Sequence, residues 1–333
     1  MTNNGASGNT QEQIQYTLGF EGLDAQELNT AFKDLQKLLL NMDKKTQFHI
    51  AKSIWYRNTF SLRDGFNAII KENYDGEIKP LDFNDPQAKN LINQWVETKT
   101  QNKIKELIKA VTTDHVMFLI NAIYFKSSWT YRFDKSATKP MDYKKVNDSV
   151  VSRDMMFSDK LKFLYSHDDQ VQFIDLPYGK QQFYMSIILP REDVSINDVI
   201  NNLDAEKLKK LVQQADTSGA NLYLPKFKLE YEIKLNEALK AMGMEEAFSN
   251  RADFSNFFTN PESLAISEVN HKTFIEVDEE GTEAAAATSV GIIVTSIPAT
   301  PPAIHINRPF ILFIREKSTE NILFAGKILD PAG

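Results

Sequence analysis

Residues 116–125 constrain the fold more than any other feature of this sequence. The run reads VMFLINAIYF, and Asn121 is its only strongly polar side chain. A strand with one solvent-exposed face alternates between apolar and polar residues, whereas a strand that is buried on both faces does not. We therefore expect this run to be a strand in a sheet that carries other elements on both of its faces.

Helical and strand patterns are largely separated along the chain. From Asp24 to Met42, apolar side chains recur at helical spacing, and a second helical pattern starts near Pro86 and continues to Ile108. A third covers about residues 235–242. Strand patterns occupy residues 48–56, 116–125, 172–177, 183–189, 221–229, 264–269, 273–277, 303–307, 310–315 and 322–328. Early helices and late strands, without strand–helix–strand alternation, predict an α+β fold of large, mainly antiparallel sheets with helices packed around them.

Composition and charge exclude several classes of function. The net charge of −7 argues against nucleic acid or an anionic membrane surface as a partner. The chain contains no cysteine, which excludes disulfides, thiolate metal sites and a cysteine nucleophile. No window has the ~18 consecutive apolar residues of a membrane-spanning helix. The first dozen residues form a polar lead without the plan of a signal peptide.

Residues 281–302 are the one segment with a biased composition, and they begin with GTEAAAAT. Alternate residues of a strand face opposite sides. One face would carry Thr282, Ala284, Ala286 and Thr288, and the other would carry Glu283, Ala285, Ala287 and Ser289. The first face is small and uncharged, so it could meet a packed core without burying a charge or overfilling the core. The alternative is a flexible, alanine-rich surface loop with no further role.

Motifs along the whole chain resemble those of the serpins, in the same order. GTEAAAAT at residues 281–288, an apolar loop and IHINRPFILF at residues 304–313 resemble the serpin hinge and C-terminal signature. Further matching segments lie at residues 93–97, 100–104, 121–129, 224–227, 242–244, 253–255, 269–272 and 324–327. The resemblance covers essentially all 333 residues. It implies the serpin fold, a single domain over residues 1–333 with three sheets and an exposed reactive loop at about residues 281–303.

The beginning of the chain departs from the family pattern. Residues 1–8, MTNNGASG, resemble a stretch well inside the serpin fold, close to its fourth helix. We therefore expect the family's opening helices and one buried strand to be absent from this sequence. Most serpins act outside the cytoplasm, so the resemblance implies an extracellular, periplasmic or cell-surface location. It also implies a monomer.

The resemblance implies a serine-type endopeptidase inhibitor that acts as a suicide substrate. The target protease cleaves the loop and becomes covalently attached, and the freed hinge then enters the main sheet as an extra strand. With the spacing that is usual in the family between the hinge and the reactive bond, counting from Gly281 places this bond between Thr295 and Ser296. Ile293 and Val294 are alternatives for the residue that binds in the specificity pocket of the protease. These residues are uncharged and mostly β-branched, which predicts elastase-like or broad specificity.

The resemblance also assigns residues around the main sheet. Asn121 and His271 match the shutter, where a side-chain hydrogen bond could hold the sheet closed. Trp129 matches the breach, where insertion starts, and Lys226 and Glu279 match an ion pair at the hinge. Two alternatives stay open, namely that His271 is a satisfied core histidine and that Trp129 is plain core filling.

The sequence also bears on three alternatives: an enzyme, a cofactor or cation site, and a non-inhibitory serpin. An enzyme is not expected, because the sequence lacks G-x-S-x-G, H-E-x-x-H and a glycine-rich phosphate loop. No cofactor is expected either; residues 167–169, His-Asp-Asp, hint at a cation site, but a solvated loop is the alternative. The main rival is a non-inhibitory serpin, such as a carrier, chaperone or storage protein. Such members tend to carry bulky, charged or proline residues at the hinge, and the inward face here carries none.

Overall fold

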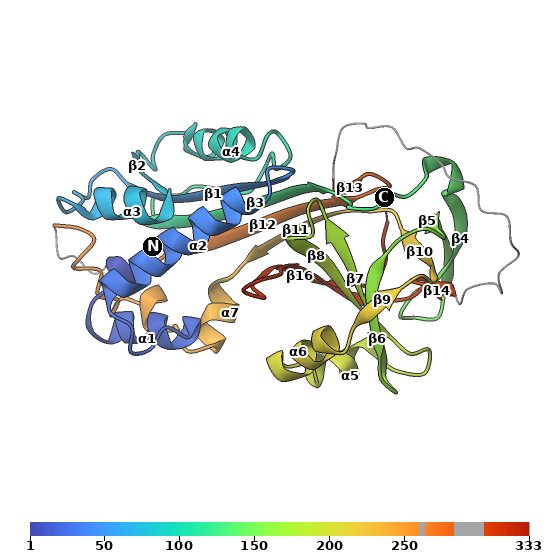
Figure 1. Ribbon diagram of the computed structural model, residues 1–333. Helices are drawn as coiled ribbons and strands as arrows, with labels where there is room; N and C mark the ends of the chain where they lie inside the picture. Colours follow the sequence, from blue (N-terminus) through green and yellow to red (C-terminus); the bar gives the residue numbers. More distant parts are fainter. Residues whose placement is uncertain (260–263, 283–302, 333) are drawn as a thin grey trace, which may run out of the picture. The chain divides into compact units, whose positions relative to one another are not determined.

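The computed structural model describes residues 1–259, 264–282 and 303–332, and its strands form three sheets in these ranges (Figure 1). The main sheet has the strand order β11-β12-β3-β1-β2, and β13 pairs with β3 beside this path. Its strands are β1 (Thr46–Arg57), β2 (Glu77–Leu81), β3 (Met117–Ser128), β11 (Phe227–Lys234), β12 (Glu268–Val277) and β13 (Gly281–Thr282).

The other two sheets are built mostly from hairpins. One has the order β14-β10-β5-β4 and the other β16-β15-β8-β7-β6-β9. Their strands are β4 (Lys139–Lys144), β5 (Val150–Ser158), β6 (Phe163–His167), β7 (Val171–Tyr178), β8 (Phe183–Pro190), β9 (Asp216–Ser218), β10 (Asn221–Pro225), β14 (Ala303–His305), β15 (Phe310–Glu316) and β16 (Ile322–Ile328). The second of these sheets is antiparallel throughout, in agreement with the predicted fold class.

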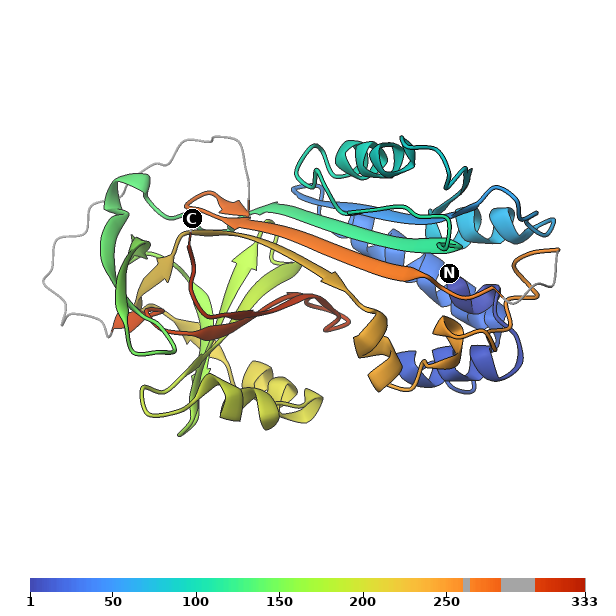
Figure 2. The same cartoon turned by 180° about the vertical axis from the view of Figure 1, so that it is seen from behind.

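Helices cover the sheets, and Figure 2 shows the same arrangement from behind. The α-helices are α1 (Gly8–Leu18), α2 (Ala25–Met42), α3 (Phe66–Tyr74), α4 (Ala88–Lys99), α5 (Ile196–Asn201), α6 (Ala205–Gln213) and α7 (Asn236–Ala241). Short 3-10 turns occur at η1 (Thr2–Asn4), η2 (Lys135–Ala137) and η3 (Glu246–Phe248). Within this part of the chain, no helix is both long and apolar enough to span a bilayer.

The chain packs into two compact units, one of residues 1–41, 48–124 and 230–274, and one of residues 42–47, 125–229 and 275–333. In the first unit, β3 has a hydrophobic cluster on each face. Phe118, Ile120 and Tyr124 pack with residues of α4, whereas Met117 packs with residues of α1, α3 and the region near Phe257. The expectation that this strand is covered on both faces is therefore confirmed.

The second unit has its own core. Apolar residues of β7, β8 and β15 pack against α5 and α6. The charged residues Asp175 and Arg315 are also buried there, where Arg315 pairs with Asp175 and donates from Nε to Ser186 Oγ at 2.8 Å.

Four sequence predictions of secondary structure need correction. The helical pattern from Pro86 to Ile108 is a helix only to Lys99, because Gln101 and Asn102 have positive φ angles of 51° and 62° that end it. The first dozen residues, predicted as a polar lead, include the start of α1, which begins at Gly8. The strand pattern at residues 221–229 is two strands, β10 and β11. The patterns at residues 264–269 and 273–277 together mark one strand, β12, which begins at Glu268.

Candidate functional site

The first two residues of the predicted hinge are already paired with the main sheet. Gly281 pairs with Ser128 and Thr282 with Ser127, antiparallel to β3. Gly281 has a φ of 143°, and a Cβ at this position would lie only 2.6 Å from the Cα of Ser128. Glycine is therefore required here both by its backbone angle and by the close approach of β3.

The two strands between which the hinge would insert, β12 and β3, form a parallel pair. β12 runs alongside β3 from the pair Glu268 and Phe118 to the pair Phe274 and Tyr124. A strand that entered between them in the direction of β13 would be antiparallel to both. It would replace one parallel ladder by two antiparallel ladders, which are slightly more stable per residue.

The predicted breach residue Trp129 lies in a buried cluster around the hinge. Its ring is stacked on that of Tyr178, with centroids 4.4 Å apart and an interplanar angle of 8°. Its Nε1 donates to the backbone oxygen of Asp278 at 2.8 Å, just before the hinge. Tyr178 in turn forms a hydroxyl hydrogen bond of 2.7 Å with Thr282. Trp129 therefore contacts the chain that leads into the hinge, in addition to filling the core.

The structure forms the predicted ion pair between Lys226 and Glu279, with 3.0 Å between Nζ and Oε2. The Glu279 side chain is only 4% exposed, while that of Lys226 is 45% exposed. Thr138 also donates to Glu279 through its hydroxyl at 2.8 Å. Burial alone would raise the pKa of Glu279, but the hydrogen bonds from Thr138, the backbone and Lys226 outweigh it and lower this pKa. Glu279 is thus held as a carboxylate beside the hinge.

The two predicted shutter residues are brought together by the pairing of β3 with β12. Asn121 and His271 are register partners, and Asn121 Nδ2 lies 3.4 Å from His271 Nδ1. Burial lowers the pKa of His271, and this effect outweighs a backbone hydrogen bond at Asn121 that raises it. Asn121 Oδ1 is buried and has no hydrogen-bond partner among the described residues.

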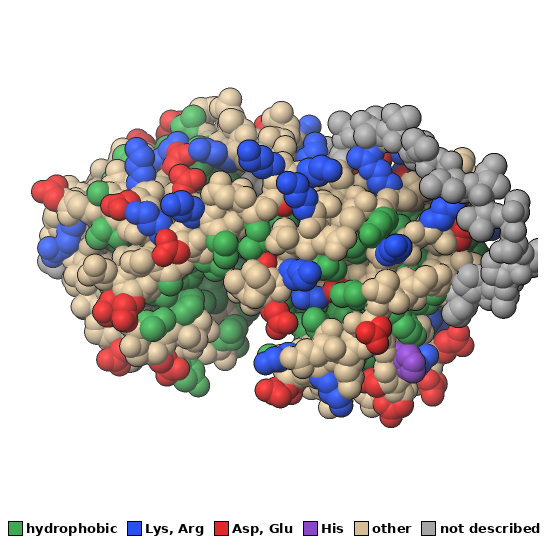
Figure 3. Space-filling model, viewed as in Figure 1, with side chains coloured by type: hydrophobic (Ala, Val, Ile, Leu, Met, Phe, Trp, Pro, Cys, Tyr) green, Lys and Arg blue, Asp and Glu red, His purple; other side chains and the backbone are tan. Residues whose placement is uncertain are grey.

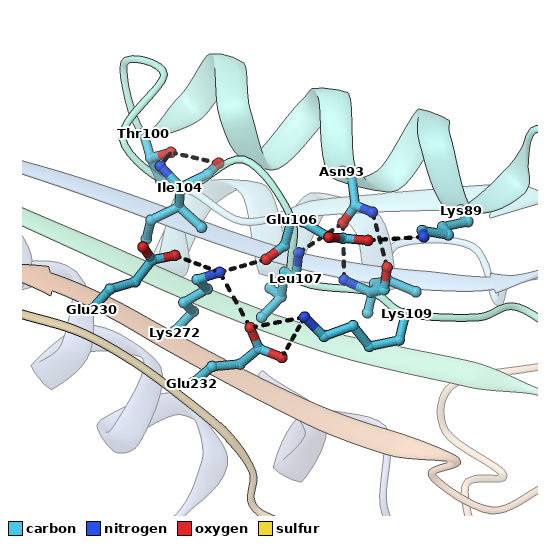
Figure 4. Close-up of polar contacts among 11 residues, drawn as sticks. Lys89, Asn93, Thr100, Ile104, Glu106, Leu107, Lys109, Glu230, Glu232 and Lys272 are labelled. Carbon is cyan, nitrogen blue, oxygen red and sulfur yellow. Dashed lines mark hydrogen bonds and ion pairs between the residues drawn. The ribbon is translucent and has the colours of Figure 1, made fainter.

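Residues 101–114, which we call the strap, follow α4. Polar contacts attach the strap to β12 and back to α4 (Figure 4). Lys272 of β12 donates from Nζ to the backbone oxygen of Glu106 at 2.6 Å. The same Nζ pairs with Glu230 at 2.7 Å and Glu232 at 3.2 Å. Burial would lower the pKa of Lys272, but the two carboxylates raise it above its usual value. Lys272 is thereby kept charged although its side chain is only 6% exposed.

The other end of this attachment is α4. Asn93 accepts from the backbone amides of Leu107 and Ile108 at 3.0 and 2.9 Å, and donates to the oxygen of Ile108 at 2.9 Å. Lys89 pairs with Glu106 at 2.8 Å, and Lys109 pairs with Glu232 at 3.2 Å. Polar contacts therefore replace the helical hydrogen bonds that the sequence pattern predicted for this segment.

Several predicted site residues lie outside the described part of the chain. These are the hinge residues Glu283, Ala284, Ala285, Ala286, Ala287 and Thr288 and the reactive-bond candidates Ile293, Val294, Thr295 and Ser296. Conversely, sequence reasoning missed Tyr178, Ser127, Asn93 and Lys272. Lys272 lay in the matching segment 269–272 but between the two predicted strand patterns, so its position inside a buried strand gave no signal in the sequence.

The described residues contain no group of three metal-ligating side chains. At residues 167–169, Asp168 instead uses Oδ1 to accept from the backbone amides of Gln170 and Val171, at 2.8 and 2.7 Å. This hydrogen bonding is that of a turn between β6 and β7.

Comparisons with known proteins agree with the geometry. A family model described as "Serpin (serine protease inhibitor)" matches residues 1–331. Intracellular coagulation inhibitor 2 of Tachypleus tridentatus is 35% identical over 97% of this chain and 81% of that protein. The native state of the thermophilic serpin tengpin has a TM-score of 0.90 at 35% identity, over 99% of this chain and 84% of that one. Human thyroxine-binding globulin also reaches 0.90, at 28% identity over 100% and 88%.

Proposed function

Because this chain belongs to the serpin family of serine protease inhibitors, we propose that it traps a serine protease by loop cleavage and insertion of its hinge between β12 and β3. Most of its relatives are inhibitors, and serpins typically bind target serine proteases. The observation that carries the proposal is the seating of Gly281 and Thr282 beside β3.

The register of β13 supports insertion of the rest of the hinge. If it continues, each further hinge residue meets the preceding residue of β3, so Thr288 arrives opposite Asn121. Thr282, Ala284, Ala286 and Thr288 then share the face of Ser127 and Asn121, because opposite residues of a ladder point to one side. That face needs small, uncharged side chains, which this hinge provides.

Insertion also requires the existing contacts to change. The ladder between β3 and β12 has to open, and with it the Asn121–His271 contact. Since Lys272 ties β12 to Glu106 of the strap, movement of β12 relative to α4 would strain this attachment as well. The intact protein is thereby held in a closed state by contacts that do not involve the loop.

The reactive bond that we propose joins Thr295 and Ser296, and the uncharged residues before it favour elastase-like or broad-specificity proteases. The protein should be incubated with elastase and with trypsin and resolved by SDS gel electrophoresis. We expect an SDS-stable complex with elastase, and mass spectrometry should locate the cut after Thr295, Val294 or Ile293. A complex with trypsin alone would refute the specificity.

A non-inhibitory serpin is the rival that this experiment can detect. The fold alone does not decide between the two, because thyroxine-binding globulin, solved in complex with thyroxine, and the serpin tengpin match this chain with the same TM-score of 0.90. Turnover of the loop by every protease without any SDS-stable complex would establish the rival. An inhibitor should also melt at a clearly higher temperature after loop cleavage than before.

We also propose that the protein acts outside the cytoplasm, on the basis of the family resemblance. Immunoblots of secreted and cellular fractions from the source organism would test this, and a signal confined to the cytosolic fraction would refute it.

A further inference from the structure

A cavity of about 570 Å³ in the first unit is lined by residues of α2, β1, α3, β2 and α4. Basic side chains gather on the face of the molecule over β1, β2 and α4 (Figure 3). The cavity contains no residue of the hinge, the shutter or the breach. Protease inhibition therefore gives no account of it.

The cavity lining is positively charged, whereas the whole protein has a negative net charge. Its lining includes four lysines, at positions 52, 71, 79 and 99, and two acids, Asp75 and Glu77. This leaves an excess of positive charge in a chain whose net charge is −7. A concave site with one dominant sign of charge concentrates ions of the opposite sign.

Glu77 is already fully engaged and does not neutralise the remaining lysines. Its carboxylate pairs with Lys79 at 2.8 Å and Lys99 at 2.5 Å, and accepts from Trp95 Nε1 at 3.0 Å. Although burial raises the pKa of Glu77, these donors outweigh it and lower the pKa to about 2. Lys79 is fixed further by the rings of Trp55 and Trp95, whose centroids lie 5.3 and 5.7 Å from its Nζ.

Lys52 is the partly buried cation of this cavity that has no carboxylate partner among the described residues. Its side chain is partly buried on β1, and its Nζ donates to Gln36 Oε1 at 2.5 Å. No described carboxylate lies within ion-pair distance of it or of Lys71. Burial lowers the pKa of Lys52 to about 8, with only partial opposition from the more distant Asp75. A partly buried ammonium without an anionic partner is destabilising unless a ligand provides one.

We propose that this cavity binds a small, multiply charged oxyanion that carries phosphate or sulfate groups, with Lys52 and Lys71 as its direct ligands. Lys52 reaches the site from β1 and Lys71 from the last turn of α3, so an anion between them would be contacted from two elements. Charge-assisted hydrogen bonds from ammonium groups are the strong kind. The proposal is independent of protease inhibition and would stand if that function failed.

The test uses the full 333-residue chain and two probes, inorganic pyrophosphate and sucrose octasulfate. Binding is measured by isothermal titration calorimetry and by tryptophan fluorescence, since Trp95 lines the cavity. We expect saturable one-to-one binding of at least one probe. Binding of pyrophosphate alone would indicate a phosphate source for the natural ligand, and binding of sucrose octasulfate alone would indicate a sulfate source.

Three variants locate the site. Lys52→Met keeps the apolar stem and should weaken binding roughly tenfold or more, and Lys71→Met should weaken it several-fold. Lys33→Met is the matched control, because Lys33 lies on α2 outside the cavity and already pairs with Glu72 at 2.8 Å. It should change the affinity less than about twofold.

Two results would overturn the proposal. One is the absence of saturable binding of either probe at millimolar concentration. The other is an equal loss of affinity in Lys33→Met and Lys52→Met, which would indicate only a diffuse basic surface. If circular dichroism shows that Lys52→Met does not fold, the exposed Lys71 carries the same comparison.

Discussion

Tyr178 and Thr282 share a hydrogen bond of 2.7 Å between their hydroxyl oxygens, and both side chains are completely buried. Thr282 is the second residue of the hinge, and Tyr178 is the last residue of β7. The bond therefore anchors the start of the segment that we propose to insert. It also means that a substitution at Thr282 acts inside a packed core and not at a loop surface.

Thr282→Arg should convert the inhibitor into a substrate. Thr282 is already buried against Tyr178 and beside Ser127 in the intact protein, so an unpaired guanidinium there would displace the start of the hinge from β3 before cleavage. Insertion would then be slower than hydrolysis of the acyl-enzyme, so SDS gels should show cleaved protein and little complex with elastase. The matched control is Glu283→Gln, which changes the adjacent residue on the other side of the strand without adding a positive charge. Undiminished complex formation by Thr282→Arg would contradict the proposed insertion.

The continued register places Glu283 opposite Lys126 after cleavage. Such a cross-strand pair of opposite charges contributes about 0.2–1 kcal/mol. Lys126→Glu should therefore lower the melting temperature of the cleaved protein more than that of the intact protein. Adding Glu283→Lys should restore it. Identical melting shifts in the intact and cleaved forms would show that insertion follows a different register.

The stability of the protein should fall as the pH drops below about 6.5, in part through His271. Its pKa is lowered in the folded protein, so the unfolded chain binds the proton more readily and acid favours unfolding. The stabilisation is present above the unfolded pKa and is lost as the pH falls toward the folded value. Melting temperatures at pH 7.5 and 5.5 should differ less in His271→Gln than in the unmodified protein. His167→Gln, at an exposed position, should leave the difference unchanged.

Lys272→Met should destabilise the intact protein by roughly 1–3 kcal/mol. It removes the donor to the Glu106 carbonyl and the ammonium that Glu230 and Glu232 share, although these two carboxylates remain 51% and 31% exposed. Lys109→Met is the control, because this lysine pairs with the same Glu232 but is 64% exposed. It should cost only about 0–1 kcal/mol. Denaturant unfolding would measure both, and equal effects would show that burial of Lys272 does not matter.

The fold was predictable where one strong pattern decided each element. The helix of residues 25–42 follows from the helical spacing of its apolar residues, and the central strand of residues 117–128 follows from its nearly continuous apolar run. The strap was mistaken for helix because Ile104, Leu107 and Ile108 are buried at helix-like spacing. What ends the helix is the positive φ of Gln101 and Asn102. Asn102 was a usable stop signal, because asparagine tolerates the left-handed conformation, whereas Gln101 carried none.

The site was predictable only in part. The resemblance brought Lys226 together with Glu279 and Asn121 with His271, and the structure shows both contacts. Tyr178 could not be linked to Thr282 from the sequence, because the two are 104 positions apart and join only through sheet packing. Lys52 was also missed, since its lack of a carboxylate partner becomes visible only when β1, α2 and α3 are placed together.

The stacking of Trp129 on Tyr178 makes Trp129 an intrinsic fluorescence probe of the hinge. Of the three tryptophans, Trp55 and Trp95 lie with their ring centroids 6.0 Å apart in the first unit, whereas Trp129 belongs to the second and is bonded to the chain that enters the hinge. A protein that keeps only Trp129, with phenylalanine at the other two positions, would therefore report hinge movement through its emission alone. Stopped-flow fluorescence could then measure the rate at which the cleaved loop inserts, without an attached dye.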